Sequence, residues 1–120
     1  MPQFVDPFPG VAPDRKMTPA ELVRAIRMDL AAEEEAVHQY ESHADATDNE
    51  LAKAVLHDIA NEERVHAGEF QRLINLLAPD EEGFLAEGAA EVNVVAAKVQ
   101  GGAAPSQPSP TVPTVGDLRK

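Results

Sequence analysis

The chain has 120 residues, a formal net charge of -11 and no cysteine. This length allows one small domain, and the lack of cysteine excludes disulfides, thiolate metal sites and cysteine nucleophiles. The acidic charge argues against binding to nucleic acid or to an anionic membrane surface, because both require cationic patches, and no apolar run approaches the roughly 20 residues that span a bilayer.

Two long helices dominate the predicted secondary structure. Residues 1–17 hold four prolines and two phenylalanines without periodicity, which predicts an extended N-terminal arm. Thr18-Pro19-Ala20-Glu21 then combines an N-cap residue, a proline at the first helical position and a capping-box glutamate, so a helix begins here and runs to about Ala46. After a short polar turn, a second helix runs from about Glu50 to just before Pro79, because proline disfavours a helical residue ahead of it. A turn this short predicts an antiparallel hairpin.

The rest of the chain is less regular. Residues 84–99 have a weaker helical pattern that Gly88 interrupts, and we expect one short C-terminal helix there, within a helical domain of residues 18–99. Residues 100–113 carry no charge and are rich in Gly, Ala, Pro and Ser, which is typical of a flexible linker before the closing segment 114–120. The expected fold is all-α. Because two helices cannot bury their apolar faces unaided, we expect the hairpin to dimerise into a four-helix bundle.

Ionisable side chains interrupt the apolar stripe of both long helices. Each stripe has helical spacing and is expected to be buried, yet the first contains Glu33 and the second contains Glu63 and His66 near their midpoints. A buried carboxylate is costly unless it is paired or coordinates a metal. The stripes consist of Leu22, Ile26, Leu30, Glu33, Val37, Tyr40 and Ala44, and of Val55, Ile59, Glu63, His66, Phe70, Leu73 and Leu77.

Glu33, Glu63 and His66 form half of the ligand set of a di-iron carboxylate site. Four-helix di-iron sites take one glutamate from each of two helices and a Glu-x-x-His pair from each of the other two. This chain supplies one copy of each element, so two copies complete the set, which predicts both a metal and a dimer. Carboxylates and imidazole suit iron or manganese, and the absence of thiolates disfavours structural zinc. The alternative is an ordinary solvated helix face, because Glu-x-x-His occurs by chance in many helices.

Several neighbouring side chains have secondary roles in this hypothesis. Tyr40 lies on the Glu33 face and is either a hydrogen-bond donor or weak ligand at the metal site or a plain core aromatic. The remaining histidines and acidic residues of the two midpoints fall off the stripes and are predicted to be surface residues: His38, His43, His57, Glu34, Glu35, Glu41 and Glu62.

The two helix midpoints resemble the encapsulated ferritins, which are two-helix members of the ferritin-like superfamily packaged inside encapsulin nanocompartments. The resemblance covers residues 18–98 and is carried by Glu33-Glu34-Glu35-Ala36-Val37-His38-Gln39-Tyr40-Glu41 and by Asn61-Glu62-Glu63-Arg64-Val65-His66-Ala67-Gly68-Glu69-Phe70. It implies a ferroxidase that oxidises Fe(II) to Fe(III) with O2 at a di-iron centre between two subunits, with Glu33, Glu63 and His66 as iron ligands and Tyr40 beside them. It also implies a decameric ring of dimers that passes iron to the surrounding shell for storage. Some members have an accessory acidic site, which Glu35 matches and Ala32 does not.

The C-terminal end carries a second resemblance. Val112, Val115 and Leu118 recur every third residue after the uncharged linker, and Thr114-Val115-Gly116-Asp117-Leu118-Arg119 resembles the targeting peptides that dock cargo on the inner wall of encapsulin shells. A few apolar side chains on a tether can fill pockets repeated across a shell, and multivalency raises a modest affinity. This resemblance implies the encapsulin shell as a partner. With no recognisable signal peptide, we expect a cytoplasmic protein inside a nanocompartment.

Two other functions remain open. The same bundle can support another di-iron or di-manganese enzyme that handles peroxide, although the chain has no rubredoxin-like cysteines to supply electrons. A non-catalytic helical adaptor that is tethered to its partner by the tail is the second alternative.

Overall fold

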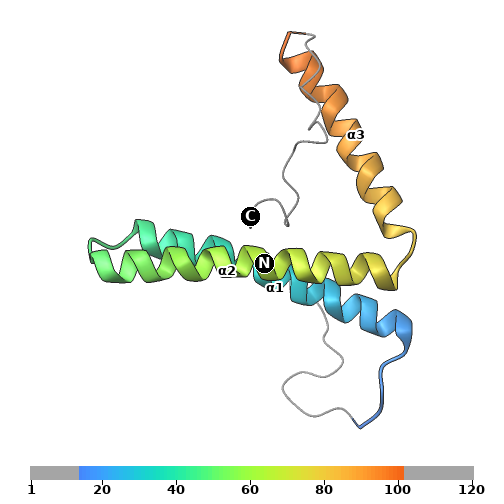
Figure 1. Ribbon diagram of the computed structural model, residues 1–120, viewed down its shortest axis with the longest axis horizontal. Helices are drawn as coiled ribbons and strands as arrows, with labels where there is room; N and C mark the ends of the chain where they lie inside the picture. The colour runs from blue at the N-terminus through green and yellow to red at the C-terminus, as the bar shows by residue number, and fades with distance from the viewer. Residues whose placement is uncertain (1–13, 102–120) are drawn as a thin grey trace, which may run out of the picture. The chain divides into compact units, whose positions relative to one another are not determined.

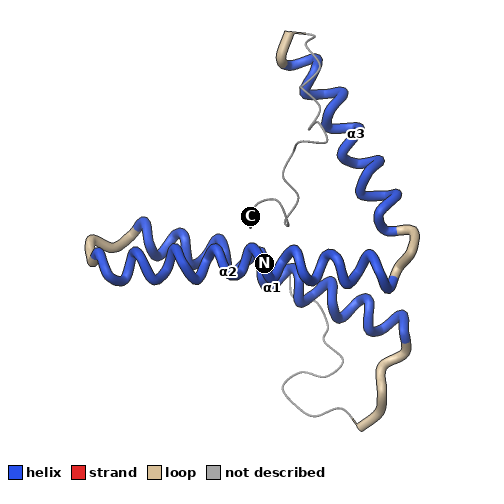
Figure 2. The backbone as a smooth tube through the Cα atoms, in the orientation of Figure 1, coloured by secondary structure: helices blue, strands red, loops and turns tan. Residues whose placement is uncertain are grey.

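The computed structural model describes residues 14–101, and this part of the chain is all-helical. It contains three helices, α1 (Pro19–Asp45), α2 (Glu50–Leu77) and α3 (Glu81–Val99), and no strand among the described residues (Figures 1 and 2). The predicted all-α class is confirmed. Most of the predicted arm, nearly all of the linker and the whole 114–120 peptide lie outside the described residues. None of the helices within residues 14–101 combines the length and the apolar character of a bilayer-spanning segment.

The start of α1 is fixed by the predicted capping box. The Glu21 backbone N–H donates to the Thr18 hydroxyl at 3.1 Å, and the Thr18 backbone N–H donates to the Glu21 carboxylate at 2.9 Å. Arg15 adds a bidentate ion pair to Glu21, at 2.8 and 2.6 Å, and this hydrogen-bonded guanidinium is the main cause that lowers the pKa of Glu21 to about 2. The carboxylate therefore supports the cap fully above its ordinary pKa of 4.5 and loses this role as the pH falls through about 2.

Helices α1 and α2 form the predicted antiparallel hairpin, and they lie side by side along their length (Figure 1). The turn between them ends at Asn49, whose side chain accepts a hydrogen bond from the Ala52 backbone N–H at 2.9 Å and so caps α2. At the other end of the hairpin, Arg27 of α1 forms a bidentate ion pair with Glu81, just beyond α2, at 2.8 and 2.7 Å. Polar contacts thus fix the start of α2 and tie α1 to the residues just beyond the end of α2.

A narrow seam of mostly small side chains forms the core of the hairpin. Ile26 and Ala44 of α1 are buried against Ala60, Ala67 and Ile74 of α2. Alanines allow the two helix backbones to approach closely, so on α2 the line of Ala60, Ala67 and Ile74, rather than the bulkier stripe, lies at the helix contact.

The apolar stripe of α2 is not buried within the single hairpin, and its burial in the expected dimer stays a prediction. Val55, Leu73 and Leu77 of that stripe are 48%, 40% and 42% exposed. The physical reason is that one neighbouring helix can cover only one side of α2, and the alanine line occupies that side. The bulky stripe is left for another partner.

Helix α3 begins at Glu81, earlier than the expected Phe84, and continues through Gly88 without a break. The chain divides into two compact units at the junction of Glu81 and Glu82, so α3 belongs almost entirely to the second unit. No residue of α3 is buried. Its large exposed apolar side chains are Phe84, Leu85, Val92, Val94, Val95 and Val99.

Candidate metal centre

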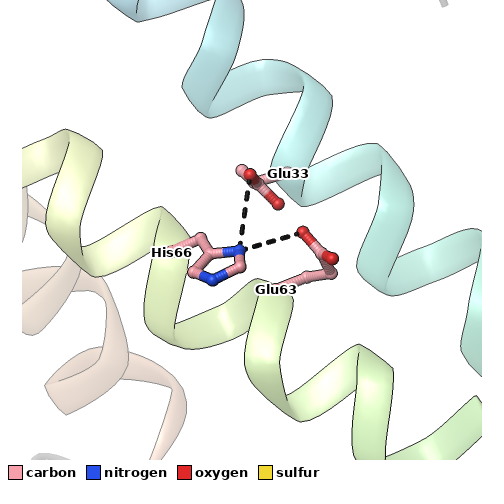
Figure 3. Close-up of side chains that lie close together, drawn as sticks. All are labelled: Glu33, Glu63 and His66. Carbon is pink, nitrogen blue, oxygen red and sulfur yellow. Dashed lines mark hydrogen bonds and ion pairs between the residues drawn. The ribbon is translucent and has the colours of Figure 1, made fainter.

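Glu33 of α1 and Glu63 and His66 of α2 converge at the middle of the hairpin (Figure 3). His66 Nδ1 lies 3.4 Å from Glu63 Oε2 and 3.6 Å from Glu33 Oε1. One ligand atom from each of the three residues lies within 4.8 Å of the other two. The structure thus brings together the three residues that the sequence singled out, and their role as metal ligands stays a prediction.

The short turn of the hairpin sets this convergence. Glu33 lies 12 residues before the end of α1, and Glu63 lies 13 residues after the start of α2. In an antiparallel pair these positions lie at nearly the same distance from the turn, so the two carboxylates meet across the seam. His66 follows Glu63 by three residues, which places the imidazole on the same side of α2 and about one turn further along.

The three side chains differ in their exposure to solvent. Those of Glu33 and Glu63 are each 19% exposed, whereas that of His66 is 46% exposed. The two carboxylates are therefore partly withdrawn into the hairpin, and the site opens toward solvent on its His66 side. Three side chains also supply fewer donor atoms than two iron ions require. A single hairpin accordingly offers an incomplete, open ligand set.

The charge of the cluster favours a cation. Among residues 14–101, no lysine or arginine pairs with Glu33 or Glu63, and the His66 imidazole is their one potential cationic partner. Two partly buried carboxylates at this separation repel each other unless a proton or a metal ion lies between them. Two carboxylates and an imidazole, with no thiolate, are donors that suit iron or manganese, so the residues present fit such an ion.

The other side chains of the hypothesis lie outside this cluster. Tyr40 is half-buried on α1, about two turns after Glu33, and is not among the converging groups, so its role beside a metal stays a prediction. The six side chains that the structure places on the surface, as predicted, are His38, His43, His57, Glu34, Glu35 and Glu62.

Glu41 makes a contact that the pattern within its own helix does not predict. Its side chain is 37% exposed, and its carboxylate forms an ion pair with Arg64 of α2, the residue that directly follows Glu63. Neither residue falls on an apolar stripe, and the pairing depends on the reach of a long arginine across the seam, which no pattern within one helix reveals.

Comparison with known proteins places the chain among ferritin-like proteins. The sequence model of the rubrerythrin family matches residues 6–97. The chain is 42% identical, over 133 aligned residues that cover 100% of both proteins, to the encapsulin nanocompartment cargo protein EncC of Myxococcus xanthus (strain DK1622). It is 35% identical over 79 residues to the ferritin-like-encapsulin shell fusion protein of Pyrococcus furiosus, an alignment that covers 66% of this chain and 23% of that larger protein.

A solved structure supports the same relationship. The crystal structure of the encapsulated ferritin domain from Pyrococcus furiosus matches with a TM-score of 0.67 and 32% sequence identity, covering 75% of this chain and 91% of that one. The fold and the sequence therefore agree, and the resemblance to encapsulated ferritins is confirmed. The chain belongs to the rubrerythrin family of ferritin-like proteins and is a homologue of the encapsulated ferritins.

Proposed function

We propose that the chain is a ferroxidase, which oxidises Fe(II) to Fe(III) with O2 at a di-iron centre formed between two copies of the hairpin. The observation that carries this proposal is the convergence of Glu33, Glu63 and His66 without a lysine or arginine partner among the described residues. One glutamate on one helix and a Glu-x-x-His pair on the other make half of the four-helix di-iron ligand set. Bound iron would supply the redox chemistry, because each Fe(II) can give one electron to O2.

The protein side chains have two tasks in this reaction. Glu33 and Glu63 would hold the metal through carboxylate oxygens, which favour the higher charge of Fe(III) over that of Fe(II). His66 would add a neutral nitrogen donor, and its exposure leaves a path by which iron reaches the carboxylates in the open hairpin. The partial burial of both glutamates keeps the negative charge concentrated where the metal binds.

The surface around His66 supports a second copy as the partner that completes the site. Leu51, Val55, Leu73 and Leu77 are exposed large apolar residues of α2. His66 lies between Val55 and Leu73 in the sequence. The successive spacings of these five residues are 4, 11, 7 and 4, which are helical spacings, so all five lie on one side of α2. Exposed apolar surface of this kind marks an interaction site. A second hairpin packed antiparallel on this stripe would cover the apolar residues and bring a second Glu33, Glu63 and His66 to the first set.

Association beyond the dimer follows as part of the same proposal. Helix α3 has no buried residue and carries large exposed apolar side chains. Such a helix is stable in water only when other surfaces cover it. A decameric ring of dimers, as the resemblance to encapsulated ferritins implies, would provide that cover.

We further propose that the protein is cargo of an encapsulin nanocompartment in the cytoplasm, where it supplies Fe(III) for iron storage. Two observations support this partner: the relative that aligns over the whole chain is named an encapsulin nanocompartment cargo protein, and the 114–120 segment resembles a targeting peptide. The targeting residues would be Thr114, Val115, Gly116, Asp117, Leu118 and Arg119.

A second candidate function is a di-iron or di-manganese enzyme that handles peroxide. The donor set favours it, because two carboxylates and an imidazole can hold manganese as well as iron. No described feature favours a non-catalytic adaptor, since such a protein has no need of two partly buried carboxylates beside a histidine.

Oxidation of Fe(II) by the full-length protein tests the proposed function. Fe(II) is added to metal-free protein under anaerobic conditions, and the Fe(III) absorbance is followed after exposure to air. We expect a rate well above that of Fe(II) in the same buffer without protein, with two ions oxidised per dimer in the fast phase. A rate equal to the protein-free control would contradict the proposal. Faster consumption of peroxide with manganese than with iron would favour the second candidate.

Removal of residues 111–120 tests the proposed partner. The truncated protein, co-expressed with an encapsulin shell protein, should be absent from purified shells and should keep the oxidation rate of the full chain, because the ligand cluster is untouched. Packaging is measured as cargo per shell by quantitative gel analysis. Undiminished packaging of the truncated chain would overturn the targeting role of this segment.

A further inference from the structure

We propose that the ion pair between Glu41 and Arg64 positions α2 against α1 so that the ligand side chains converge; this inference rests on the proposed function. Arg64 Nη2 donates across the hairpin to Glu41 Oε1. Arg64 directly follows Glu63 and precedes His66 by two residues in the same rigid helix. Any rotation of α2 about its axis that displaces Arg64 therefore displaces both ligands with it.

The ion pair and the ligands lie on opposite flanks of the buried seam. Each residue advances an α-helix by about 100°. On α1, the buried residues Ile26 and Ala44 define the line that faces α2. Glu33 lies about 20° to one side of this line, and Glu41 lies about 60° to the other side. On α2, Glu63 lies about 50° to one side of the line through Ala60 and Ala67, and Arg64 about 50° to the other. The hairpin is thus held on one flank by a charged pair, and its other flank carries the metal ligands.

The packing at this level of the hairpin explains why such a restraint is needed. Around Glu63, the buried residues of α2 are Ala60 and Ala67, whose methyl groups interlock little with the facing helix. A ligand set has to be held within about 10–20° of its productive orientation. The two alanines near Glu63 offer little resistance to a rotation of α2 by that amount. The hydrogen bond between Arg64 and Glu41 opposes this rotation.

The stabilisation of the fold by this pair is expected to be small. The side chains of Arg64 and Glu41 are 58% and 37% exposed, and exposed ion pairs contribute little to the free energy of unfolding. A positioning role and a merely structural role therefore differ in their measurable effects. Loss of a positioning contact weakens metal binding and leaves the melting temperature nearly unchanged.

Co(II) binding to the full-length protein in the absence of O2 tests this inference. Co(II) titrates the site without turnover, and its visible spectrum reports the geometry of its ligands. We expect Arg64→Gln and Glu41→Gln each to alter the spectrum and to weaken Co(II) binding roughly 10-fold, which is the lower end of the effect of groups that hydrogen-bond directly to metal ligands, because this pair acts only through the position of α2. The melting temperature should shift by only a few degrees. The charge-swapped double variant Glu41→Arg/Arg64→Glu should restore most of the affinity and the wild-type spectrum.

Arg24→Gln provides the matched control, because Arg24 is an exposed arginine of α1 outside the ligand cluster, and it should bind Co(II) like the wild type. Wild-type affinity and spectrum in Arg64→Gln would overturn the positioning role, as would a loss that the swapped pair does not restore. A large fall in melting temperature alongside the weaker binding would assign the pair a structural role instead. Failure of the wild-type protein itself to bind Co(II) or Fe(II) would refute the proposed function, and with it this inference.

Discussion

Replacement of Glu33 by alanine should lower the initial rate of Fe(II) oxidation by more than about 100-fold, because losing a ligand costs more than the 10–100-fold typical of residues behind the ligands. Glu33 is the one member of the cluster that α1 supplies, so its loss leaves only the Glu63 and His66 pair of each chain. The metal-free variant should be at least as stable as the wild type, because a partly buried carboxylate without a lysine or arginine partner is removed. Stopped-flow absorbance at an Fe(III) wavelength gives the rate, and circular dichroism gives the stability.

Glu34→Ala is the matched control for this change. Glu34 is the next residue of α1 and is exposed, so its removal subtracts the same charge one position away from the cluster. We expect it to oxidise Fe(II) at nearly the wild-type rate. Equal rates for the two variants, or undiminished oxidation by Glu33→Ala, would show that the carboxylate of Glu33 does not hold the reacting iron.

Replacement of Leu73 by aspartate should dissociate the dimer and abolish most of the oxidation activity. Leu73 is 40% exposed and lies on the stripe that contains His66. At the proposed interface the new carboxylate would be buried without a partner, at a cost of about 2 kcal/mol or more, which weakens the dimer at least roughly 30-fold. Sedimentation velocity over a range of protein concentrations measures the association, and the oxidation assay is run on the same samples.

Ala54→Asp serves as the control for the dimer prediction. Ala54 is also exposed on α2, about 100° around the helix from Val55, and it lies further from Leu73 itself in sequence. It should associate and oxidise iron as the wild type does. If Leu73→Asp stays dimeric and active, the stripe is not the interface. If it becomes monomeric and remains fully active, a single hairpin is sufficient for the reaction.

Local signals made the hairpin predictable from the sequence. The capping box at Thr18 and Glu21 and the proline at position 79 mark where α1 begins and where α2 must stop, and both act through neighbouring backbone groups. The ligand cluster was predictable for a related reason. The turn between the helices is short, so counting residues outward from it places Glu33 opposite Glu63.

Features that depend on contact between helices were not predictable in this way. The sequence pattern groups Val55, Leu73 and Leu77 as a buried stripe, but the single hairpin buries the alanine line beside it. Which side of α2 faces α1 is decided by how closely the backbones approach, and hydrophobic periodicity does not measure this. The pairing of Glu41 with Arg64 was missed for the same reason, since it joins two helices at positions outside both stripes.

The most direct test of the account is a crystal structure of the iron-loaded protein with anomalous scattering recorded at the iron edge. We predict two iron peaks where two hairpins meet, each within bonding distance of carboxylate oxygens from Glu33 and Glu63 and of a His66 nitrogen. The second set of ligands should come from the other copy of the chain. Iron peaks elsewhere on the protein, with Glu33, Glu63 and His66 facing solvent in the assembled particle, would contradict it.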